Sequence, residues 1–313
     1  MSSTRSPNTA ATGTRRWPPR GRAMAREQSV GFIGLGIMGG AMARRLMAAG
    51  HAVHVHARNR DRAAPFLREG ALWADGAAAL ARSCATVLTI VGGPEDVAEL
   101  YLGEDGLVAN AAPGDCLVDM TTSAPDLARR IAAEAAGRGV MALDAPVTGG
   151  APGAEAGTLT FMVGGEAAAL AAVQPLLEVM GSRVFAMGAA GAGQIAKASN
   201  QIAVAGILLG LAEALAFAEA SGLAPGKVQE VLATGTAGGP LMQRLGPKMA
   251  AGNPEVSFTI EHFIKDLGIA IAAMPEGATR LAAAALCRDL YAGLADAGGG
   301  RKGLQALIEY YRD

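Results

Sequence analysis

The chain has 313 residues, of which 51% are apolar and 18% charged, and its formal net charge is −1 at pH 7. This length predicts two domains with an ample core, and the near-neutral charge argues against nucleic acid as a partner. The three cysteines lack CxxC spacing and the four histidines form no metal-ligand pattern with them, so we expect a reducing, cytoplasmic setting and no metal.

Residues 1–27 hold six arginines and no acid before Glu27, which predicts a disordered basic tail. An organellar presequence shares this composition, but Trp17-Pro18-Pro19 would break its amphipathic helix. No apolar segment follows Arg15-Arg16, as a secretory signal would require. Met24 lies just ahead of the first predicted strand, which favours a simple upstream extension.

Residues 29–33 predict a short apolar strand, and a helix is expected over 41–49. Between them stands a GxGxxG motif, which in this position is typical of a dinucleotide-binding turn. Its glycines allow a tight turn, close approach of a pyrophosphate, and close helix packing, while the helix N-terminus offers free N–H groups. The cofactor-binding residues predicted here are Gly34, Leu35, Gly36, Ile37, Met38 and Gly39.

The second strand, predicted over 52–55, ends before Arg58-Asn59-Arg60. An NAD enzyme carries an acid for the ribose 2′-hydroxyl at about this distance, roughly 20 residues past the motif, and this chain has none there. Arg58 and Arg60 are suited to a 2′-phosphate and Asn59 adds a donor, so NADP is favoured, with NAD possible. The alternative is an ordinary pair of solvated arginines.

Strand and helix signals then alternate, which predicts a doubly wound, largely parallel sheet. Ligands of such sheets bind at the carboxyl ends of the strands. The expected strands are 85–91, 116–119, 140–143, 159–163 and 183–185. One helix is expected to end near Leu100, and two more are expected over 125–138 and 166–180.

Thr148, Gly149 and Gly150 follow one of these strands. A hydroxyl beside successive backbone N–H groups forms a concavity that suits a carboxylate. A plain turn is the alternative.

Residues 191–221 form an apolar run without proline, which predicts one helix of roughly 40 Å leading from one domain into the next. A membrane span is disfavoured because Lys197, Glu213 and Glu219 leave an uncharged run below roughly 18 residues. Lys197 is expected in the first turn, on one face with Asn200 and Gln201. There the helix dipole and apolar surroundings would lower its pKa, as a general acid–base requires. A solvated surface lysine is the alternative.

Beyond Ser221 only helical periodicity appears, over 227–232, 241–250, 262–274, 279–296 and 303–311. The fold class predicted is therefore α/β, with an N-terminal doubly wound Rossmann domain over 28–190 followed by an all-α C-terminal domain over 191–313.

Taken together, these motifs resemble the β-hydroxyacid dehydrogenases of the 3-hydroxyisobutyrate dehydrogenase and tartronate semialdehyde reductase group. The resemblance runs from about Val30 to the end. It rests on the glycine-rich turn and on the blocks 119–125, 144–165, Gly193 to Gln201 and Lys265-Asp266-Leu267.

The resemblance implies a role for each matching residue. Lys197 is the catalytic acid–base, Asn200 orients the substrate, and Thr148, Gly149 and Gly150 hold its carboxylate. Thr122 contacts both substrate and nicotinamide, and Lys265 lies over the cofactor. Thr121 and Thr148 stand where the family usually has Ser; both keep the hydroxyl, so we expect function to survive with a changed substrate fit. Ser199-Asn200 replaces the His-Asn of the related 6-phosphogluconate dehydrogenases, which disfavours a phosphosugar.

The function expected is an NADP-preferring oxidoreductase that interconverts a short 3-hydroxy carboxylate and its semialdehyde. Two alternatives stay open. The first is an imine reductase: these enzymes share the fold, but by the resemblance they have Asp or Tyr at the position of Lys197. The second is a non-catalytic cofactor-binding module, which typically lacks the lysine. The apolar helix predicts a homodimer or homotetramer. The particular hydroxy acid and the physiological direction stay open.

Overall fold

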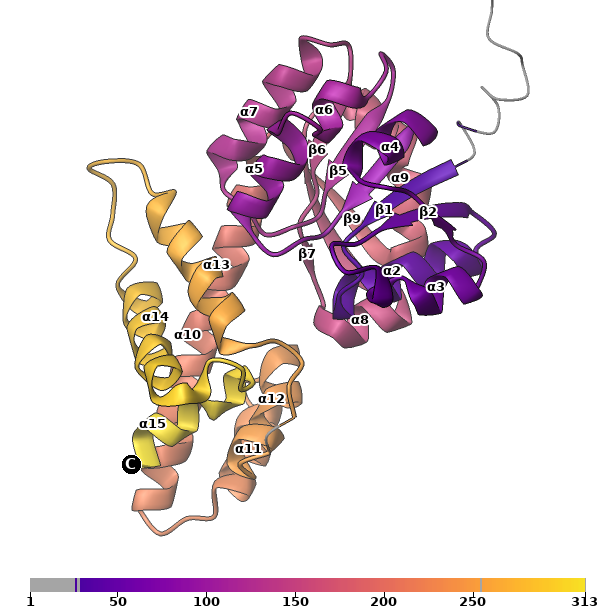
Figure 1. Cartoon of the computed structure of the whole chain (residues 1–313). Helices are drawn as coiled ribbons and strands as arrows, with labels where there is room; N and C mark the ends of the chain where they lie inside the picture. Colours follow the sequence, from indigo (N-terminus) through magenta and orange to yellow (C-terminus); the bar gives the residue numbers. More distant parts are fainter. Residues whose placement is uncertain (1–25, 27–28, 254, 313) are drawn as a thin grey trace, which may run out of the picture.

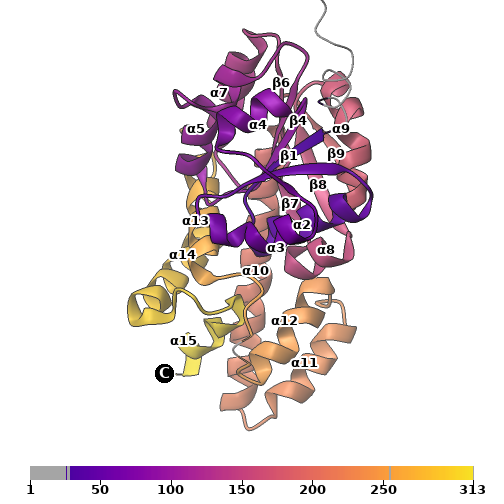
Figure 2. The ribbon, with the colours of Figure 1, turned by 45° about the vertical axis from the view of Figure 1, so that its right-hand side comes forward.

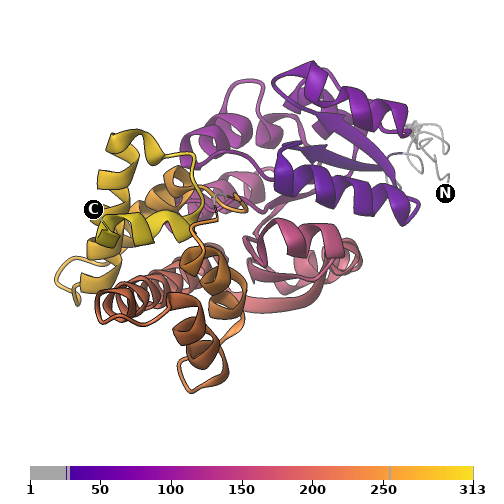
Figure 3. The ribbon, with the colours of Figure 1, turned by 90° about the horizontal axis from the view of Figure 1, so that it is seen from below.

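The computed structural model describes Arg26, residues 29–253 and residues 255–312. Figure 1 shows an α/β domain and a helical domain joined by one long helix, α10 (Ala192–Ala220). Seen from below in Figure 3, the two domains lie side by side. The predicted fold class is confirmed.

The N-terminal domain is built on a nine-stranded sheet in the order β3-β2-β1-β4-β5-β6-β8-β7, with β9 paired to β8. Neighbouring strands are parallel except where β8 meets β6 and β7. The carboxyl ends of β1, β4, β5 and β6 therefore lie along one edge of the sheet. The strands are β1 Ser29–Ile33, β2 Ala52–His56, β3 Leu72–Trp73, β4 Thr86–Thr89, β5 Cys116–Asp119, β6 Met141–Asp144, β7 Val147–Thr148, β8 Leu159–Gly164 and β9 Gly181–Gly188.

Helices cover both faces of this sheet, as its fully buried central strands require. One core joins the sheet to α2, α3, α8 and α9 around Phe32, Met42 and Phe161, and a second joins it to α4, α5, α6 and α7 around Leu80 and Tyr101. The helices are α2 Ile37–Ala48, α3 Ala64–Arg68, α4 Ala77–Ser83, α5 Pro94–Leu102, α6 Leu107–Asn110, α7 Pro125–Ala136, α8 Gly150–Ala156 and α9 Ala167–Met180, with a 3₁₀ turn η1 at Arg60–Arg62.

The C-terminal domain wraps shorter helices around the second half of α10. Phe263 and Tyr291 meet edge to face at 5.5 Å in its core, and the Tyr291 hydroxyl donates to the Leu304 carbonyl at 2.7 Å. The elements are α11 Pro225–Thr234, α12 Pro240–Ala250, α13 Ile260–Ala272, α14 Ala282–Leu294, the π-turn η2 Ala295–Gly299, the 3₁₀ segment η3 Leu304–Ile308 and α15 Glu309–Arg312.

The long helix passes between the domains and contacts β8 and β9 of the first domain and α12, α13 and α14 of the second (Figure 2). By length and composition alone α10 fits a membrane span. However, its buried residues include Gln194, Lys197 and Gln201, and they lie against the protein. Polar side chains buried among packed elements are the arrangement of a core helix.

Several predicted bounds differ from the structure. Helix α2 begins at Ile37 rather than at residue 41, because Gly36 already serves as its N-cap. The strand predicted over 183–185 extends to Gly181–Gly188, since pairing with β8 holds residues of low strand propensity. The last predicted helix, 303–311, is a 3₁₀ segment followed by a short α-helix.

The predicted tail, 1–27, lies outside the described residues except for Arg26. The Arg26 guanidinium forms an ion pair with the buried carboxylate of Asp115 and donates to the carbonyls of Ala81 and Arg82 at 3.0 and 3.2 Å. Arg26 is thus anchored to the Rossmann domain, unlike the disordered residue that the composition predicted.

Candidate active site

The turn between β1 and α2 has the geometry of a phosphate cradle. Gly34 has φ 103°, and a Cβ there would overlap the Ile90 carbonyl oxygen, so no other residue fits. Gly36 caps α2 and has open space around its Cβ position, which leaves room for a ligand close to the backbone. The first N–H groups of α2 point into that space. These residues fit the pyrophosphate of a dinucleotide.

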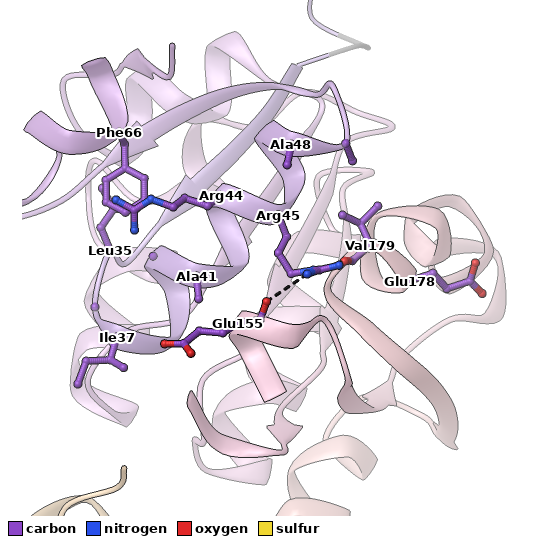
Figure 4. Close-up of a pocket in the computed structure, with 13 residues that line it drawn as sticks. Leu35, Ile37, Ala41, Arg44, Arg45, Ala48, Phe66, Glu155, Glu178 and Val179 are labelled. Atoms are coloured by element: carbon purple, nitrogen blue, oxygen red, sulfur yellow. Dashed lines mark hydrogen bonds between the residues drawn. The ribbon is translucent and has the colours of Figure 1, made fainter. Parts of the chain in front are cut away.

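A hollow runs from this turn, where Leu35, Gly36 and Ile37 line it, along the outer face of α2, and its far part has different chemistry (Figure 4). Arg44 lies over the Phe66 ring at 4.2 Å and pairs with Glu69, and Arg45 donates to the carbonyls of Val179 and Glu155 at 2.8 and 3.1 Å. Both charges are already satisfied, and none of the polar side chains around Lys197 lines this hollow. We therefore place the reacting centre elsewhere.

Arg58, Asn59 and Arg60 follow β2, as predicted. The Arg58 side chain is 87% exposed, and its Nη1 lies 3.0 Å from Oδ1 of Asp96 on α5. Asn59 caps η1 by accepting from the Asp61 N–H at 2.9 Å, and Arg60 lies over the Trp73 ring at 5.2 Å. No acidic residue stands at the end of the second strand, but Asp96 of α5 places a carboxylate beside Arg58.

Lys197 is buried in the second turn of α10, on the side of the helix that meets α13. Its Nζ donates to Gln201 Oε1 at 3.2 Å, and Gln201 Nε2 donates to Asp266 Oδ2 at 2.8 Å. A carboxylate only accepts, so Asp266 fixes the amide with its oxygen towards the lysine. The amine is therefore held by an oriented acceptor.

Burial lowers the pKa of Lys197 below a lysine's ordinary value of 10.5. The charge of Asp266 raises this pKa and that of Lys265 lowers it. The predicted direction is confirmed, but the predicted position in the first turn is wrong, because α10 already begins at Ala192. Desolvation is the main cause of the shift.

Lys265 connects the helical domain to the sheet edge. Its Nζ donates to the Thr122 carbonyl at 3.1 Å and lies 3.2 Å from Asp266 Oδ1 as an ion pair. A Cβ at Gly93, after β4, would lie 3.1 Å from the Lys265 Cδ. The ends of β4 and β5 and the Lys197 network thus meet around one side chain.

The start of α10 is fixed by Asp144 at the end of β6. Its Oδ1 accepts from the Gly191 N–H at 2.7 Å, and its Oδ2 accepts from the Gln194 N–H at 2.9 Å. Burial raises the pKa of this carboxyl, while the backbone hydrogen bonds lower it. This carboxylate supplies acceptors to helix N–H groups that otherwise lack them, and so places Lys197 along the helix.

Gln194 ties the same helix to the loop after β5. Its Nε2 donates to the Thr121 carbonyl at 2.8 Å, and its Oε1 accepts from the Ser123 N–H at 2.9 Å. The loop that carries Thr122 is therefore held at a fixed distance from Lys197.

Thr148, Gly149 and Gly150 lie at the end of β7 and the start of α8. Gly149 has φ 132° and Gly150 has φ 66°, so consecutive peptides turn in a way that only glycine readily allows. The carbonyl of Gly149 accepts from Nη1 of Arg244, a residue of α12, at 3.3 Å. The predicted carboxylate loop thus faces the helical domain.

Three buried side-chain atoms near these groups have no hydrogen-bond partner among the described residues: Asn200 Oδ1, Ser123 Oγ and Asp266 Oδ1, of which the last lies in the ion pair with Lys265. A buried unpartnered polar atom costs free energy unless a ligand or water completes it. Asn200 lies one turn from Lys197, where the sequence predicted a residue that orients substrate. The residues present therefore fit a polar ligand beside the lysine.

Sequence reasoning missed the residues that position others. Asp144, Gln194 and Asp266 lay within motifs that we had matched, but no local pattern shows their long-range partners. Asp96 and Arg244 carried no sequence signal, because their contacts join segments far apart in the chain.

Comparisons with known proteins identify the family of the chain. Residues 29–188 match the family model described as the NAD binding domain of 6-phosphogluconate dehydrogenase. Residues 191–311 match the model described as NAD-binding of NADP-dependent 3-hydroxyisobutyrate dehydrogenase.

Relatives and solved structures extend this match over nearly the whole chain. A 3-hydroxyisobutyrate dehydrogenase of Pseudomonas aeruginosa is 37% identical, covering 90% of this chain and 98% of its own length. A 2-hydroxy-3-oxopropionate reductase of Escherichia coli is 35% identical, covering 90% and 96%. The solved 3-hydroxyisobutyrate dehydrogenase of Mycobacterium tuberculosis with L-serine is 31% identical with a TM-score of 0.83, covering 92% and 100%.

An imine reductase of Streptomyces aurantiacus has a TM-score of 0.62 at 23% identity, covering 90% of this chain and 99% of that one, a likeness of fold alone. On the matches to family models and relatives, the chain belongs to the β-hydroxyacid dehydrogenases, NAD(P)-dependent oxidoreductases that act on CH–OH groups.

Proposed function

We propose that this protein is an NADP(H)-preferring oxidoreductase that interconverts a short 3-hydroxy carboxylate and its semialdehyde, of the 3-hydroxyisobutyrate or tartronate semialdehyde type. The observation that carries the proposal is the buried Lys197, whose pKa is lowered and whose Nζ is oriented by Gln201. A lysine in this state exchanges a proton more readily near neutral pH than a solvated lysine does.

Each residue around Lys197 has a separate role in the proposed reaction. In oxidation, neutral Lys197 Nζ takes the proton of the substrate hydroxyl, and in reduction its ammonium returns that proton to the forming alkoxide. Asn200 Oδ1, which has no partner among the described residues, orients the substrate. Thr148 and the backbone N–H groups of Gly149 and Gly150 hold the carboxylate.

The dinucleotide, when bound, accepts or supplies the hydride at the substrate carbon. Gly34 to Gly39 would hold its pyrophosphate, with Thr122 and Lys265 beside the reacting end. The contact of Lys265 with Thr122 supports this assignment, because it brings a cation to the sheet edge where such ligands bind.

The preference for NADP rests on Arg58 and Asn59. A guanidinium suits a 2′-phosphate because it offers charged, forked donors. Asp96 pairs with Arg58 at 3.0 Å and would repel the same phosphate, so it reduces the preference that the arginine creates. We therefore propose a preference for NADP in which NAD is still accepted.

The two alternatives fit the chain less well. The likeness to imine reductases is one of fold. This chain has a buried lysine at the position where the resemblance gives those enzymes Asp or Tyr. Burying a lysine costs desolvation free energy unless its charge is paired. A non-catalytic module gains no activity that would offset this cost.

The proposal is tested by following NADPH oxidation with tartronate semialdehyde, methylmalonate semialdehyde, succinic semialdehyde and glyoxylate. We expect saturable reduction of at least one short semialdehyde and slower turnover with NADH. A protein that binds NADPH tightly but reduces none of these compounds, and oxidises none of the matching hydroxy acids, would contradict the proposal.

We also propose that the protein is a homodimer or homotetramer associated through α10 and β9. Large apolar side chains are exposed along these elements: Phe185, Met187, Ile195, Ile207 and Phe217. Gly206 and Gly210 have open space around them, so another backbone can approach closely. Light scattering at micromolar concentration should give at least twice the mass of the chain, whereas a monomer would contradict this assembly.

A further inference from the structure

Arg244 is a charged side chain that reaches from the helical domain to the Rossmann domain. It lies on α12, which Figure 2 shows below α8, and its Nη1 donates to the Gly149 carbonyl at 3.3 Å. The same nitrogen would lie 3.7 Å from a Cβ at Gly150. The guanidinium therefore stands directly beside the loop to which we assign the substrate carboxylate.

The charge of Arg244 has no counter-ion in the parts of the chain that the structure describes. Lys265, by contrast, pairs with Asp266. A guanidinium carries five N–H donors, and the Gly149 carbonyl uses one of them. Arg244 thus keeps an unpaired positive charge and free donors beside Gly149 and Gly150.

The backbone groups of the facing loop carry no net charge. Neutral N–H donors bind a carboxylate and a neutral carbonyl with less discrimination than a cation does, because ionised partners make hydrogen bonds about twice as strong. A nearby guanidinium adds a charge–charge attraction that stabilises a bound anion but not a neutral ligand.

We infer that Arg244 determines substrate specificity: it pairs with the anionic group held at Thr148, Gly149 and Gly150, and so selects carboxylates over neutral carbonyl compounds. This inference rests on the proposed function. Since the anion is bound before and after the chemical step, Arg244 contributes to the binding of substrate more than to turnover.

A structural role is the competing explanation, because the bond to Gly149 also joins the two domains. A latch of this kind would act on every substrate alike, whereas a charge partner distinguishes an acid from its ester. The two roles therefore separate in one comparison.

The test compares Arg244→Met, Arg244→Lys and, as a control, Arg280→Met, which removes another exposed arginine. Each variant is assayed with NADPH on the best semialdehyde acid and on its neutral methyl ester. We expect Arg244→Met to lower kcat/KM for the acid by about 10- to 100-fold, chiefly through KM, and to change the ester by less than about threefold. Arg244→Lys should keep part of the preference and the control all of it.

Three results would decide against the inference or its basis. Equal losses on acid and ester would show a latch, and unchanged kinetics of Arg244→Met would show a bystander; both overturn the role of Arg244 alone. A wild-type protein inactive on every acid would instead overturn the proposed function. NADPH affinity and melting temperature, measured on each variant, should stay at wild-type values.

Discussion

Replacing Asp144 by alanine should weaken the attachment of the start of α10 to the end of β6, on which the position of Lys197 depends. The variant leaves the N–H groups of Gly191 and Gln194 buried without an acceptor, at about 1–3 kcal/mol each, or about 2–6 kcal/mol together. The raised pKa of Asp144 means that the buried carboxylate itself carries a desolvation cost, which alanine relieves. We therefore expect the lower part of this range, about 2–3 kcal/mol.

The assay is urea unfolding followed by far-UV circular dichroism, with thermal melting beside it. A loss of about 2–3 kcal/mol corresponds to roughly 5 °C in Tm for a chain of this size. Asp126→Ala is the matched control, because Asp126 lies in the first turn of α7 with its side chain 96% exposed and should cost below about 1 kcal/mol. Equal destabilisation in the two variants would refute the reasoning.

Three further predictions concern the N-terminus, the cofactor and pH. Removing residues 1–24 should leave Tm unchanged, whereas Arg26→Ala should lower the free energy of unfolding by about 2 kcal/mol because it leaves a buried carboxylate unpaired; equal Tm values for the two would contradict this anchor. Arg58→Asp should lower kcat/KM for NADPH far more than for NADH, and a wild type that uses both equally would oppose the assignment. The rate of alcohol oxidation should rise with pH through the pKa of Lys197, because the neutral amine is the base. Asp266→Asn should move that rise to lower pH, since the Asp266 charge raises this pKa; an unmoved profile would speak against the coupling.

The sequence predicted the elements whose patterns are local. Strands β1 and β5 have the predicted bounds, because short apolar runs flanked by turn residues leave little choice. Helix α10 was predicted from an apolar run without proline, although Lys197 lies one turn further along than expected. Helices α4 and α8 were not predicted, because they are short and rich in alanine and glycine and lack a clear apolar stripe.

For the site, the sequence named the residues but not what holds them. Lys197 and Asn200 were found from a shared helix face, and Thr148 from its neighbouring glycines. The contacts of Arg244 with Gly149 and of Asp96 with Arg58 join segments 95 and 38 residues apart, and only the packing of the domains brings them together.

The central claim is that Lys197 moves the proton, and its substitution tests this most directly. Lys197→Ala, with Lys197→Met as a variant that keeps the volume, should lower kcat by about 100-fold or more, because a positioned proton donor is typically worth that much. The Kd for NADPH should change little, since the pyrophosphate is held at Gly34 to Gly39 and the lost interaction belongs to the transition state. Lys197→Arg should fail almost as completely, because a guanidinium with pKa above about 12 does not release its proton. Near wild-type turnover of Lys197→Ala on every active semialdehyde would contradict the account.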